Sequence, residues 1–356
     1  MALTWVRVEQ FRCFETVELD LDPRFNLFVG ANASGKTSLL EALFFLGRGR
    51  SFRTRRLETL IRQGQKEFLI VGRAGTGQAG TTTLGLRGSR AGTELRVAGR
   101  AAQGAAELAE YFPPQVIDPE VHKLLEEGPG RRRRFLDWGV FHVEPTFLTT
   151  WQRYHKALRQ RNAALKQALP DADVRLWDSE LSTSGEVLSQ QRAGYLQELM
   201  PALQRVGQVL LGAEVTLMYH RGWPDEAGLA ASLERDLERD RRYRATQHGP
   251  HRADVVVRVE GHAAKDRVSR GQQKLLAAGL TLAQLEIQER DRPGRSALLL
   301  DDPAAELDAA NLERLLACIR VLPVQLIVTS LNPDVLGLPE QGRRFHVEHG
   351  RIAAAT

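Results

Sequence analysis

Residues 30–37 of this 356-residue chain read Gly30-Ala31-Asn32-Ala33-Ser34-Gly35-Lys36-Thr37, which matches the phosphate-binding pattern Gly-x-x-x-x-Gly-Lys-Ser/Thr at every fixed position. A predicted strand, Asn26–Val29, precedes this stretch, and a predicted helix with leucines on one broad side follows it. Glycines let backbone N–H groups curl around phosphate oxygens. The residues expected to line a nucleotide site are Gly30, Ala31, Asn32, Ala33, Ser34, Gly35, Lys36, Thr37 and Ser38.

Two side chains of this loop have expected chemical roles. Lys36 should reach the β- and γ-phosphates, and Thr37 should hold Mg²⁺. A glycine turn that ends in Lys-Thr by chance is the alternative, but the predicted strand before it and the predicted helix after it are the context that the pattern requires. The expected cofactors are therefore ATP and Mg²⁺.

An apolar strand that ends in two carboxylates supplies a second part of such a site. Ala297–Leu300 are apolar, and Asp301 and Asp302 follow directly. Alone, this pattern is equally typical of a surface turn. Together with an intact phosphate loop, it predicts that Asp301 binds the magnesium, directly or through water. Asp302 then lies where a carboxylate orients or deprotonates the attacking water.

A third motif, Ser269-Arg270-Gly271-Gln272-Gln273, precedes that strand and opens a predicted helix. Such a turn offers a hydroxyl and free N–H groups to an anion, or is a plain helix cap. The order of the three motifs resembles that of the ABC-type ATPases. The resemblance implies that the Ser269 turn of one subunit binds the γ-phosphate held by the other, and that Glu306-Leu307-Asp308 is the D-loop at the subunit contact. The additional expected nucleotide ligands are Ser269, Gly271, Gln272 and Asp308.

A helical segment separates the phosphate loop from the later motifs. Apolar residues recur at heptad-like spacing from Phe147 to Leu169 and again from Trp177 to Val209, with a turn signal at Pro170–Asp173 and an expected kink at Pro201. They predict an antiparallel pair of helices, with an ordinary helical subdomain as the alternative. Because strand patterns flank this segment, we expect one α/β domain split in sequence. The expected parts are residues 1–120, the helical insertion 121–245, and residues 246–356.

Shorter patterns predict the remaining strands and turns. Glycine-rich hairpin turns are expected at Gly75–Gly80 and Gly85–Gly88. The expected strands are Trp5–Val8, Val17–Leu21, Ala253–Val259 and Val324–Thr329, with a closing hairpin over Arg344–Ile352.

The chain resembles, from end to end, the RecF and SMC group of chromosome-maintenance ATPases, and RecF-like sequences in particular. The stretches that carry this resemblance are Arg12–Phe14, Asn32–Ala42, Pro119–Asp137, Gly249–Asp254 and Ser269–Lys274. The resemblance implies an ABC-type P-loop ATPase head, with a mixed sheet, flanking helices and an inserted helical arm. It also implies a homodimer formed with ATP, which binds double-stranded and gapped DNA in repair and replication and works with RecR and RecO to place RecA.

Two other functions have the same order of motifs. An SMC-type chromosome-organising head would need a much longer arm, and the ATPase subunit of a transporter would need membrane partners. Some residues depart from the family pattern: Glu127 and Asn311 are unusual, Asp302 replaces a glutamate, and no histidine follows Thr329-Ser330. We therefore expect a weak, DNA-stimulated ATPase that uses ATP as a switch. Gln115, at the junction of head and arm, is the expected Q-loop residue and a further metal ligand.

Composition excludes few functions, but the arginines are clustered. The formal net charge is +5, and only two cysteines occur, which fits a reducing cytoplasm. No apolar run is long enough for a membrane span, and no base-reading motif is visible. Arginine clusters are candidates for contacts to DNA phosphates, although each is also typical of a solvated face. The clusters are Arg48–Arg56, Arg131–Arg134, and Arg241–Arg244 with His248, His251 and Arg252. The arginines of the second cluster could also have a structural role, in pairs with carboxylates of the same chain.

Overall fold

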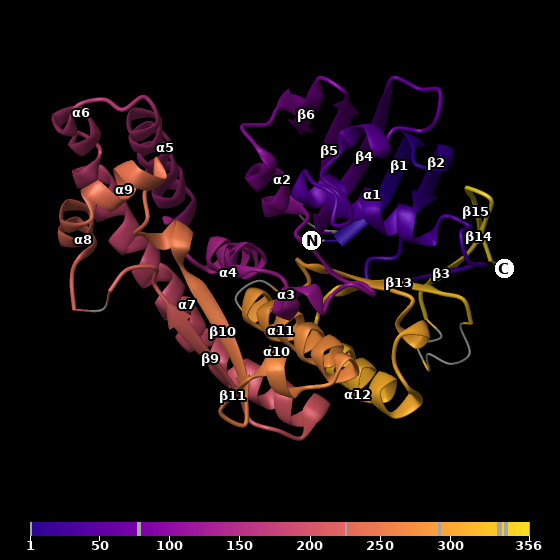
Figure 1. The fold of residues 1–356 in the computed structure, drawn as a ribbon. Coiled ribbons are helices and arrows are strands. Elements are labelled where there is room, and N and C mark those ends of the chain that lie inside the picture. The colour runs from indigo at the N-terminus through magenta and orange to yellow at the C-terminus, as the bar shows by residue number, and fades with distance from the viewer. Residues whose placement is uncertain are drawn as a thin grey trace. The chain divides into compact units, whose positions relative to one another are not determined.

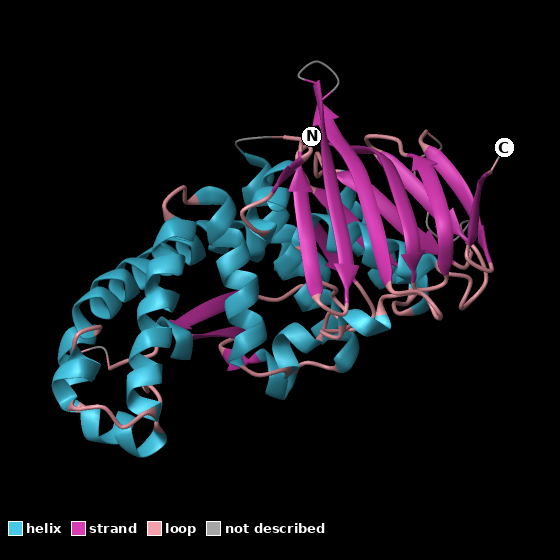
Figure 2. Ribbon diagram, turned by 90° about the horizontal axis from the view of Figure 1, so that it is seen from above, coloured by secondary structure: helices cyan, strands magenta, loops and turns pink. Residues whose placement is uncertain are grey.

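The structure is a computed structural model that describes residues 2–76, 80–224, 226–290, 293–332, 337 and 341–355. It divides into two compact units. Unit 1 comprises Met1–Val121 and Leu280–Thr356, and unit 2 comprises His122–Gly279. Strands predominate in unit 1 and helices in unit 2, as the magenta and cyan ribbons of Figure 2 show.

A mixed six-stranded sheet in unit 1 carries both the phosphate loop and the carboxylates. Its order is β15-β14-β3-β13-β12-β8, and all neighbours are parallel except the hairpin β14–β15. All five residues of β12 are buried, which suits a strand covered on both faces. The strands are β3 (Phe25–Val29), β8 (Pro114–Ile117), β12 (Ala297–Asp301), β13 (Gln325–Ser330), β14 (Arg343–Glu348) and β15 (Arg351–Ala354). The expected strands near residues 26, 297 and 324 and the closing hairpin are confirmed.

A second sheet of unit 1 is antiparallel, with the order β2-β1-β4-β5-β6-β7. The hairpin expected at Gly85–Gly88 is wrong, because both glycines lie inside β5. Gly88 instead makes room for an aromatic ring, since a Cβ there would lie 2.2 Å from Cζ of Phe68. The tip of the hairpin expected at Gly75–Gly80, residues 77–79, lies outside the described residues. The strands are β1 (Ala2–Phe11), β2 (Phe14–Asp20), β4 (Glu67–Thr76), β5 (Gly80–Ser89), β6 (Gly92–Val97) and β7 (Arg100–Ala101).

Helix α1 (Lys36–Arg48) lies between the two sheets and contacts strands of both (Figure 1). It is therefore buried nearly all round, and its leucines and phenylalanines join one core with both sheets. Two further helices of unit 1 are α2 (Ala105–Tyr111) and α12 (Ala309–Arg320). The position of α1 fixes the phosphate loop at its N-terminus against the ends of β3 and β12.

Unit 2 contains the expected pair of antiparallel helices, α5 (Phe147–Lys166) and α7 (Asp178–Leu211). Arg161 contacts Asp178, whereas Thr146, ahead of α5, contacts Gln191. The turn expected at Pro170–Asp173 continues into the short helix α6 (Asp171–Arg175), and α7 runs through Pro201. The other helices are α3 (Lys123–Glu126), α4 (Pro129–Val143), α8 (Leu229–Arg235), α9 (Leu237–Tyr243) and α10 (Ala264–Arg267).

The second boundary of the insertion differs from the expected one. We expected the chain to return to the ATPase head at residue 246, but unit 2 extends to Gly279. The reason is that β10 (Asp254–Val259) pairs with β9 (Val215–His220) and with β11 (His262–Ala263) in a small sheet of unit 2. Helix α11 (Arg270–Arg290) then passes from unit 2 into unit 1. Across the described residues, no helix is long and apolar enough to cross a membrane.

Candidate nucleotide site

The phosphate loop joins the end of β3 to the start of α1. The Gly30 N–H donates to the carbonyl of Ser330 at the end of β13 (3.3 Å), and Ala33 has a positive φ of 61°. The first backbone hydrogen bond of the helix runs from the Leu39 N–H to the Gly35 carbonyl (3.0 Å). Among the described residues, no backbone carbonyl accepts from the N–H groups of Lys36, Thr37 and Ser38, which is the arrangement that binds anions at a helix N-terminus.

The side chains of Lys36 and Ser34 are buried within this loop. The Lys36 ammonium donates to the carbonyls of Gly30 (2.6 Å) and Ala31 (3.0 Å). Ser34 is 6% exposed, and its Oγ has no hydrogen-bond partner among the described residues. A buried hydroxyl without a partner is costly, and a phosphate oxygen would satisfy it. The loop thus fits a phosphate group.

Thr37 and Asp301 meet although 264 residues separate them in sequence. Thr37 Oγ1 lies 2.9 and 3.1 Å from the two carboxylate oxygens of Asp301, and the Thr329 hydroxyl donates to the same carboxylate at 2.8 Å. Burial raises the pKa of Asp301, although the hydrogen bonds from Thr329 and Thr37 act in the opposite direction. A cation beside this carboxylate would offset the cost of its desolvation.

The oxygens of Thr37 and Asp301 are ligands that Mg²⁺ prefers. In the described part of the chain, no group of three or more His, Cys, Asp or Glu residues could hold a metal ion by itself. Magnesium at this position would therefore depend on phosphate oxygens and water for the rest of its coordination, which is usual for Mg²⁺ bound with nucleotides. The pair fits a magnesium ion that arrives with ATP.

Asp302 and Asp308 follow β12 in unit 1. Asp302 has a positive φ of 44°, and its N–H donates to the Thr329 carbonyl (3.1 Å). Strained backbone of this kind is concentrated at functional sites. Asp308 caps α12 by accepting from the Asn311 N–H (2.8 Å) and side-chain amide (2.7 Å). Asn311, which departs from the family pattern, thus holds the expected D-loop aspartate.

The structure does not bring Gln115 to the magnesium pair, so its expected role as a metal ligand is wrong. Gln115 lies inside β8 opposite Leu298, and its amide donates to the Gln288 side chain (3.2 Å). Leu298 precedes Asp301 by three positions, so the two side chains point to opposite faces of the sheet. Ile117 pairs with Leu300 in the sheet. The residue that follows Ile117, Asp118, is therefore next to the position of Asp301 along the neighbouring strand.

The Ser269 turn lies in unit 2 at the start of α11. The Ser269 N–H donates to the Gln272 side chain (2.9 Å), and the Gln272 N–H donates to Ser269 Oγ (3.3 Å). This reciprocal pair is a capping box. Ser269, Gly271 and Gln272 are all exposed, and a Cβ on Gly271 would meet nothing within 4 Å. The helix-cap interpretation is thus correct for the isolated chain, and the turn presents its hydroxyl and glycine at the surface.

Sequence reasoning assigned no role to Glu41, which is fully buried in α1. Arg12 donates to both of its carboxylate oxygens at 2.8 Å, and Ser51 also donates to it. The pair ties the turn between β1 and β2 to the helix that follows the phosphate loop. The signal was a charged residue inside the apolar run Leu39–Leu43. Burial of a carboxylate requires such partners.

The cluster Arg131–Arg134 has a largely structural role, because its side chains form ion pairs and hydrogen bonds within the protein. Arg132 makes a bidentate pair with Asp254 (2.7 and 3.0 Å), Arg133 donates to the Ala253 carbonyl (2.6 Å), and Arg131 pairs with Glu127 (3.1 Å). The Gly249–Asp254 stretch is further held by Arg192, which donates to the Pro250 carbonyl (2.7 Å) and pairs with Asp137. The two sequence stretches that look most specific to RecF-like proteins therefore bind each other within unit 2.

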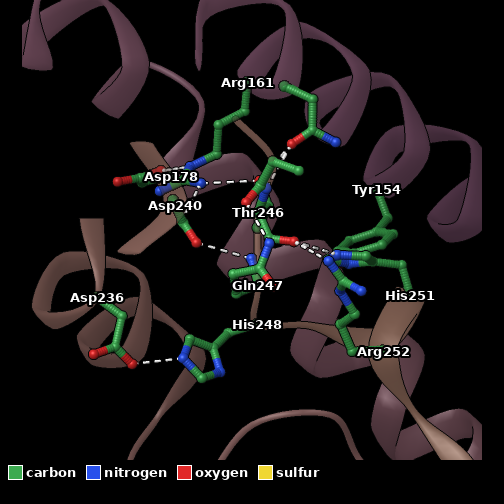
Figure 3. A network of polar contacts seen from close by, with 12 residues as sticks. Tyr154, Arg161, Asp178, Asp236, Asp240, Thr246, Gln247, His248, His251 and Arg252 are labelled. Carbon is green, nitrogen blue, oxygen red and sulfur yellow. Dashed lines mark hydrogen bonds and ion pairs between the residues drawn. The ribbon is translucent and has the colours of Figure 1, made fainter. Parts of the chain in front are cut away.

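The third arginine cluster is likewise part of a polar network in unit 2 (Figure 3). Fully buried Arg161 donates to Asp178, Asp240 and Thr246 at 2.6, 2.6 and 2.9 Å. Arg241 pairs with Asp171, and His248 lies 2.5 Å from Asp236. Arg241 and His248 are thus engaged by carboxylates, whereas Arg242 and Arg244 are exposed.

His251 occupies one end of this network. Its Nε2 lies 2.9 Å from the Thr246 carbonyl, which only accepts, so Nε2 carries the proton. Its Nδ1 accepts from the Tyr154 hydroxyl at 2.6 Å. Burial is the main reason that the pKa of His251 is lowered to about 4, and burial raises the pKa of Tyr154. Both groups are therefore neutral at pH 7.

Acidification should destabilise unit 2 through His251. Its pKa is lowered to about 4 in the folded protein. An unfolded histidine titrates near pH ~6.5, so the unfolded state binds more protons between these values and stability falls as the pH falls through this window. Protonation should lower the free energy of unfolding by about 2 kcal/mol between pH 7 and pH 5. Denaturant unfolding at pH 7 and pH 5 checks this. The difference in free energy of unfolding between the parent and His251→Gln should be smaller at pH 5 than at pH 7. The same difference for His262→Gln, a substitution at an exposed histidine, should not depend on pH. An equal difference at both pH values for His251→Gln would contradict it.

Residues 2–351 match the family model described as RecF/RecN/SMC N terminal domain. The DNA replication and repair protein RecF of Edwardsiella ictaluri is 41% identical over 357 residues, covering 99% of this chain and 100% of the relative. The protein of the same name from Pseudomonas aeruginosa strain LESB58 is 40% identical over 366 residues, covering 100% of this chain and 98% of the relative.

Solved structures agree with the sequence relatives. The recombination mediator protein RecF-ATP in the RecFOR pathway superposes with a TM-score of 0.89 at 25% identity, covering 100% of this chain and 98% of that one. An Smc head bound to the C-winged helix domain of ScpA has a TM-score of 0.60 at 15% identity, covering 100% and 98%, and shares the fold alone. The head with a mixed sheet, flanking helices and an inserted helical arm is therefore confirmed. The chain belongs to the RecF family of ABC-type ATP-binding proteins, within the larger RecF/RecN/SMC group.

Proposed function

We propose that this chain is an ATP-dependent DNA-binding protein of recombinational repair and replication-gap processing, in which ATP acts as a switch for dimerisation. The observation that carries the proposal is the contact between Thr37 and Asp301 beside a complete phosphate loop. Their oxygens are ligands that Mg²⁺ prefers, and they lie beside a loop suited to phosphate. ATP-bound relatives with the same fold support the nucleotide assignment.

Each residue of the site has a distinct task. The loop N–H groups and Lys36 bind the β- and γ-phosphates, and Ser34 adds its buried hydroxyl. Thr37 and Asp301 hold the magnesium, which neutralises developing charge on the phosphates when it is bound. Asp302 orients or deprotonates the attacking water. Because aspartate is one methylene shorter than glutamate, this water is held less well and hydrolysis is slow.

A second copy of the chain completes the site. The Ser269 turn is exposed, and its hydroxyl and the N–H groups of the first turn of α11 are suited to an anion. We assign to it the γ-phosphate held by the partner subunit, with Asp308 at the contact between the two copies. ATP bridges the two copies, and hydrolysis releases them. This arrangement follows from the order of motifs that the chain shares with ABC-type ATPases.

DNA binding is assigned to the arginines that follow α1. The cluster near residue 131 is largely engaged with carboxylates and carbonyls, and the cluster near residue 241 has two exposed arginines, Arg242 and Arg244. The segment after α1 has more, because Arg50, Arg53, Arg55 and Arg56 are all exposed, although Arg53 also pairs with Glu41 at 3.5 Å. Contacts from such a group go to phosphates, carry no sequence preference and weaken steeply with salt. Binding of double-stranded and gapped DNA in the ATP-bound dimer, with stimulation of the weak ATPase, follows from this assignment.

The partners we propose are RecR and RecO, with loading of RecA on gapped DNA as the outcome. Support comes from the relatives, which are named as DNA replication and repair proteins and as a recombination mediator of the RecFOR pathway. The proposed nucleotide site and the exposed arginines after α1 are the features that such an assembly would use.

Replacement of Asp302 by asparagine tests the switch. The substitution keeps the shape of the side chain but removes the base, so ATP should bind and remain uncleaved. Sedimentation velocity with ATP and magnesium should show Asp302→Asn as a persistent dimer, and the parent protein as a dimer that dissociates as ATP is consumed. Asp20→Asn, which makes the same substitution at an exposed aspartate of β2 in the same unit, serves as a control. Monomers for both parent and Asp302→Asn would contradict the proposal.

A further inference from the structure

The C-terminal hairpin β14–β15 touches the phosphate loop at several points within unit 1. Strand β14 runs parallel to β3, with Phe345 opposite Phe28 and His346 opposite Val29. Its next residue, Val347, lies beside the first glycine of the loop, since a Cβ on Gly30 would come within 2.1 Å of the Val347 carbonyl oxygen. The hairpin is firmly anchored there, because the rings of Phe345 and Phe28 stack with centroids 4.6 Å apart.

The turn of this hairpin forms a hydrogen bond to the loop itself. His349 and Gly350 both have positive φ, 45° and 74°, as in the two-residue turns favoured between antiparallel strands. The Gly350 N–H donates to the Ser34 carbonyl at 3.0 Å. The turn also packs tightly on the loop between β1 and β2, since a Cβ on Gly350 would lie 2.6 Å from the Cys13 carbonyl oxygen.

This hydrogen bond determines the direction of one loop amide. The Ser34 carbonyl and the Gly35 N–H belong to the same peptide unit, which is trans, because no described peptide bond is cis. In a trans peptide the carbonyl and the N–H point in opposite directions. Because Gly350 donates to the Ser34 carbonyl, the Gly35 N–H points away from the hairpin turn, and the proposed phosphate would lie on that side of the peptide.

The geometry points to the C-terminal hairpin as part of the nucleotide site, with Gly350 as a positioning residue that orients the Gly35 amide toward phosphate. This inference rests on the proposed nucleotide function and extends it to a segment outside the known loop and acidic motifs. By reciprocity, a contact that favours nucleotide binding is itself strengthened when the nucleotide binds. The hairpin is therefore coupled to nucleotide occupancy although it does not contact a phosphate.

The chain contains a matched control for this inference. The turn between β10 and β11 has the same geometry, with Glu260 at φ 49° and Gly261 at φ 74°. A Cβ on Gly261 would meet nothing within 4 Å. Asparagine tolerates the left-handed region better than most residues, so it adds a side chain with little backbone strain. Gly350→Asn and Gly261→Asn thus impose the same backbone change, and only the first pushes the turn away from Cys13 and Ser34.

Calorimetric titration with magnesium-ATP tests the inference on the full-length protein. Gly350→Asn should bind ATP roughly tenfold more weakly than the parent, the effect of one misdirected loop amide, and Gly261→Asn should stay within about twofold. Equal ATP affinity for the two variants, both folded, would overturn the inference. A parent protein that binds no ATP would instead refute the nucleotide site itself.

Hydrogen exchange on the unsubstituted protein provides a second test that does not depend on the folding of a variant. Saturating ATP should slow exchange of the amides of residues 349–351 and leave those of residues 260–262 unchanged. A hairpin with only a structural role would not respond to the nucleotide. Unchanged exchange at residues 349–351 in protein shown to hold ATP would therefore overturn the inference even if Gly350→Asn failed to fold.

Discussion

Lys36→Met should abolish ATP binding. Methionine matches the length of lysine but has neither its charge nor its hydrogen-bond donors. Hydrogen bonds to charged groups each contribute about 1.5–3 kcal/mol, so the loss of two to the β- and γ-phosphates should weaken binding roughly 10²- to 10⁴-fold. The ammonium already lies in the loop, where it donates to the Gly30 and Ala31 carbonyls. Magnesium-ATP titration of parent and variant measures the effect.

Lys66→Met is the appropriate control for this substitution. Lys66 is exposed and lies in the same unit, between the loop after α1 and β4. Lys66→Met removes the same positive charge from the protein as Lys36→Met does. A general electrostatic effect on ATP affinity would therefore appear in both variants. We expect Lys66→Met to bind ATP as the parent does. Binding by Lys36→Met within about threefold of the parent, a difference of less than 1 kcal/mol, would contradict the assignment of the loop.

Arg161→Met should strongly destabilise unit 2. The guanidinium is fully buried, and its removal leaves Asp240, which is 1% exposed, without its ionic partner. Breaking a buried pair by removing one partner costs about 3–5 kcal/mol, because an uncompensated charge stays in the interior. For a unit of this size, the melting temperature should fall by roughly 10 °C. Tryptophan fluorescence reports this transition, because Trp138, Trp151, Trp177 and Trp223 all lie in unit 2.

Arg153→Met provides a matched comparison on the same helix. Arg153 also makes a bidentate pair, with Glu180 at 2.8 and 3.0 Å, but both side chains are largely exposed, at 56% and 40%. Exposed pairs contribute only about 0–1 kcal/mol. If the two variants lost equal stability, burial would not be what makes the Arg161 network important, and the interpretation of that network as structural would fail.

Local patterns predicted the parts of the site that are contiguous in sequence. The phosphate loop was recognisable because its glycines, Lys36 and Thr37 lie within eight positions between a strand and a helix. The acidic strand was recognisable because β12 is a continuous apolar run, as expected for a parallel strand buried on both faces. The meeting of Thr37 and Asp301 then followed from the order of motifs, since the ends of parallel strands share one edge of a sheet.

Features that depend on register or distant pairing were not predictable in the same way. Gln115 was placed at the junction of head and arm, but the register of β8 on β12 turns it to the other face of the sheet. The second domain boundary was misplaced because β10 has the pattern of any half-buried strand. Only its pairing with β9 assigns it to unit 2. Likewise, a run of arginines does not show whether its partners are carboxylates elsewhere in the chain or DNA.

The composite nature of the active site can be tested directly by mixing two inactive variants. Lys36→Met has a defective phosphate loop and an intact Ser269 turn, whereas Ser269→Arg has the reverse. Ser269 is exposed at the start of α11, so its replacement should leave the fold and ATP binding intact. In a mixed dimer, the phosphate loop of one chain would face the Ser269 turn of the other, which yields one complete site and one that is defective on both sides.

ATP hydrolysis by the equimolar mixture, with DNA and magnesium present, is the decisive measurement. If each site is shared between two copies, neither variant alone should hydrolyse ATP and the mixture should regain activity. If the mixture stays as inactive as its components while the parent protein hydrolyses ATP under the same conditions, the Ser269 turn does not act across a dimer and the proposed switch is contradicted.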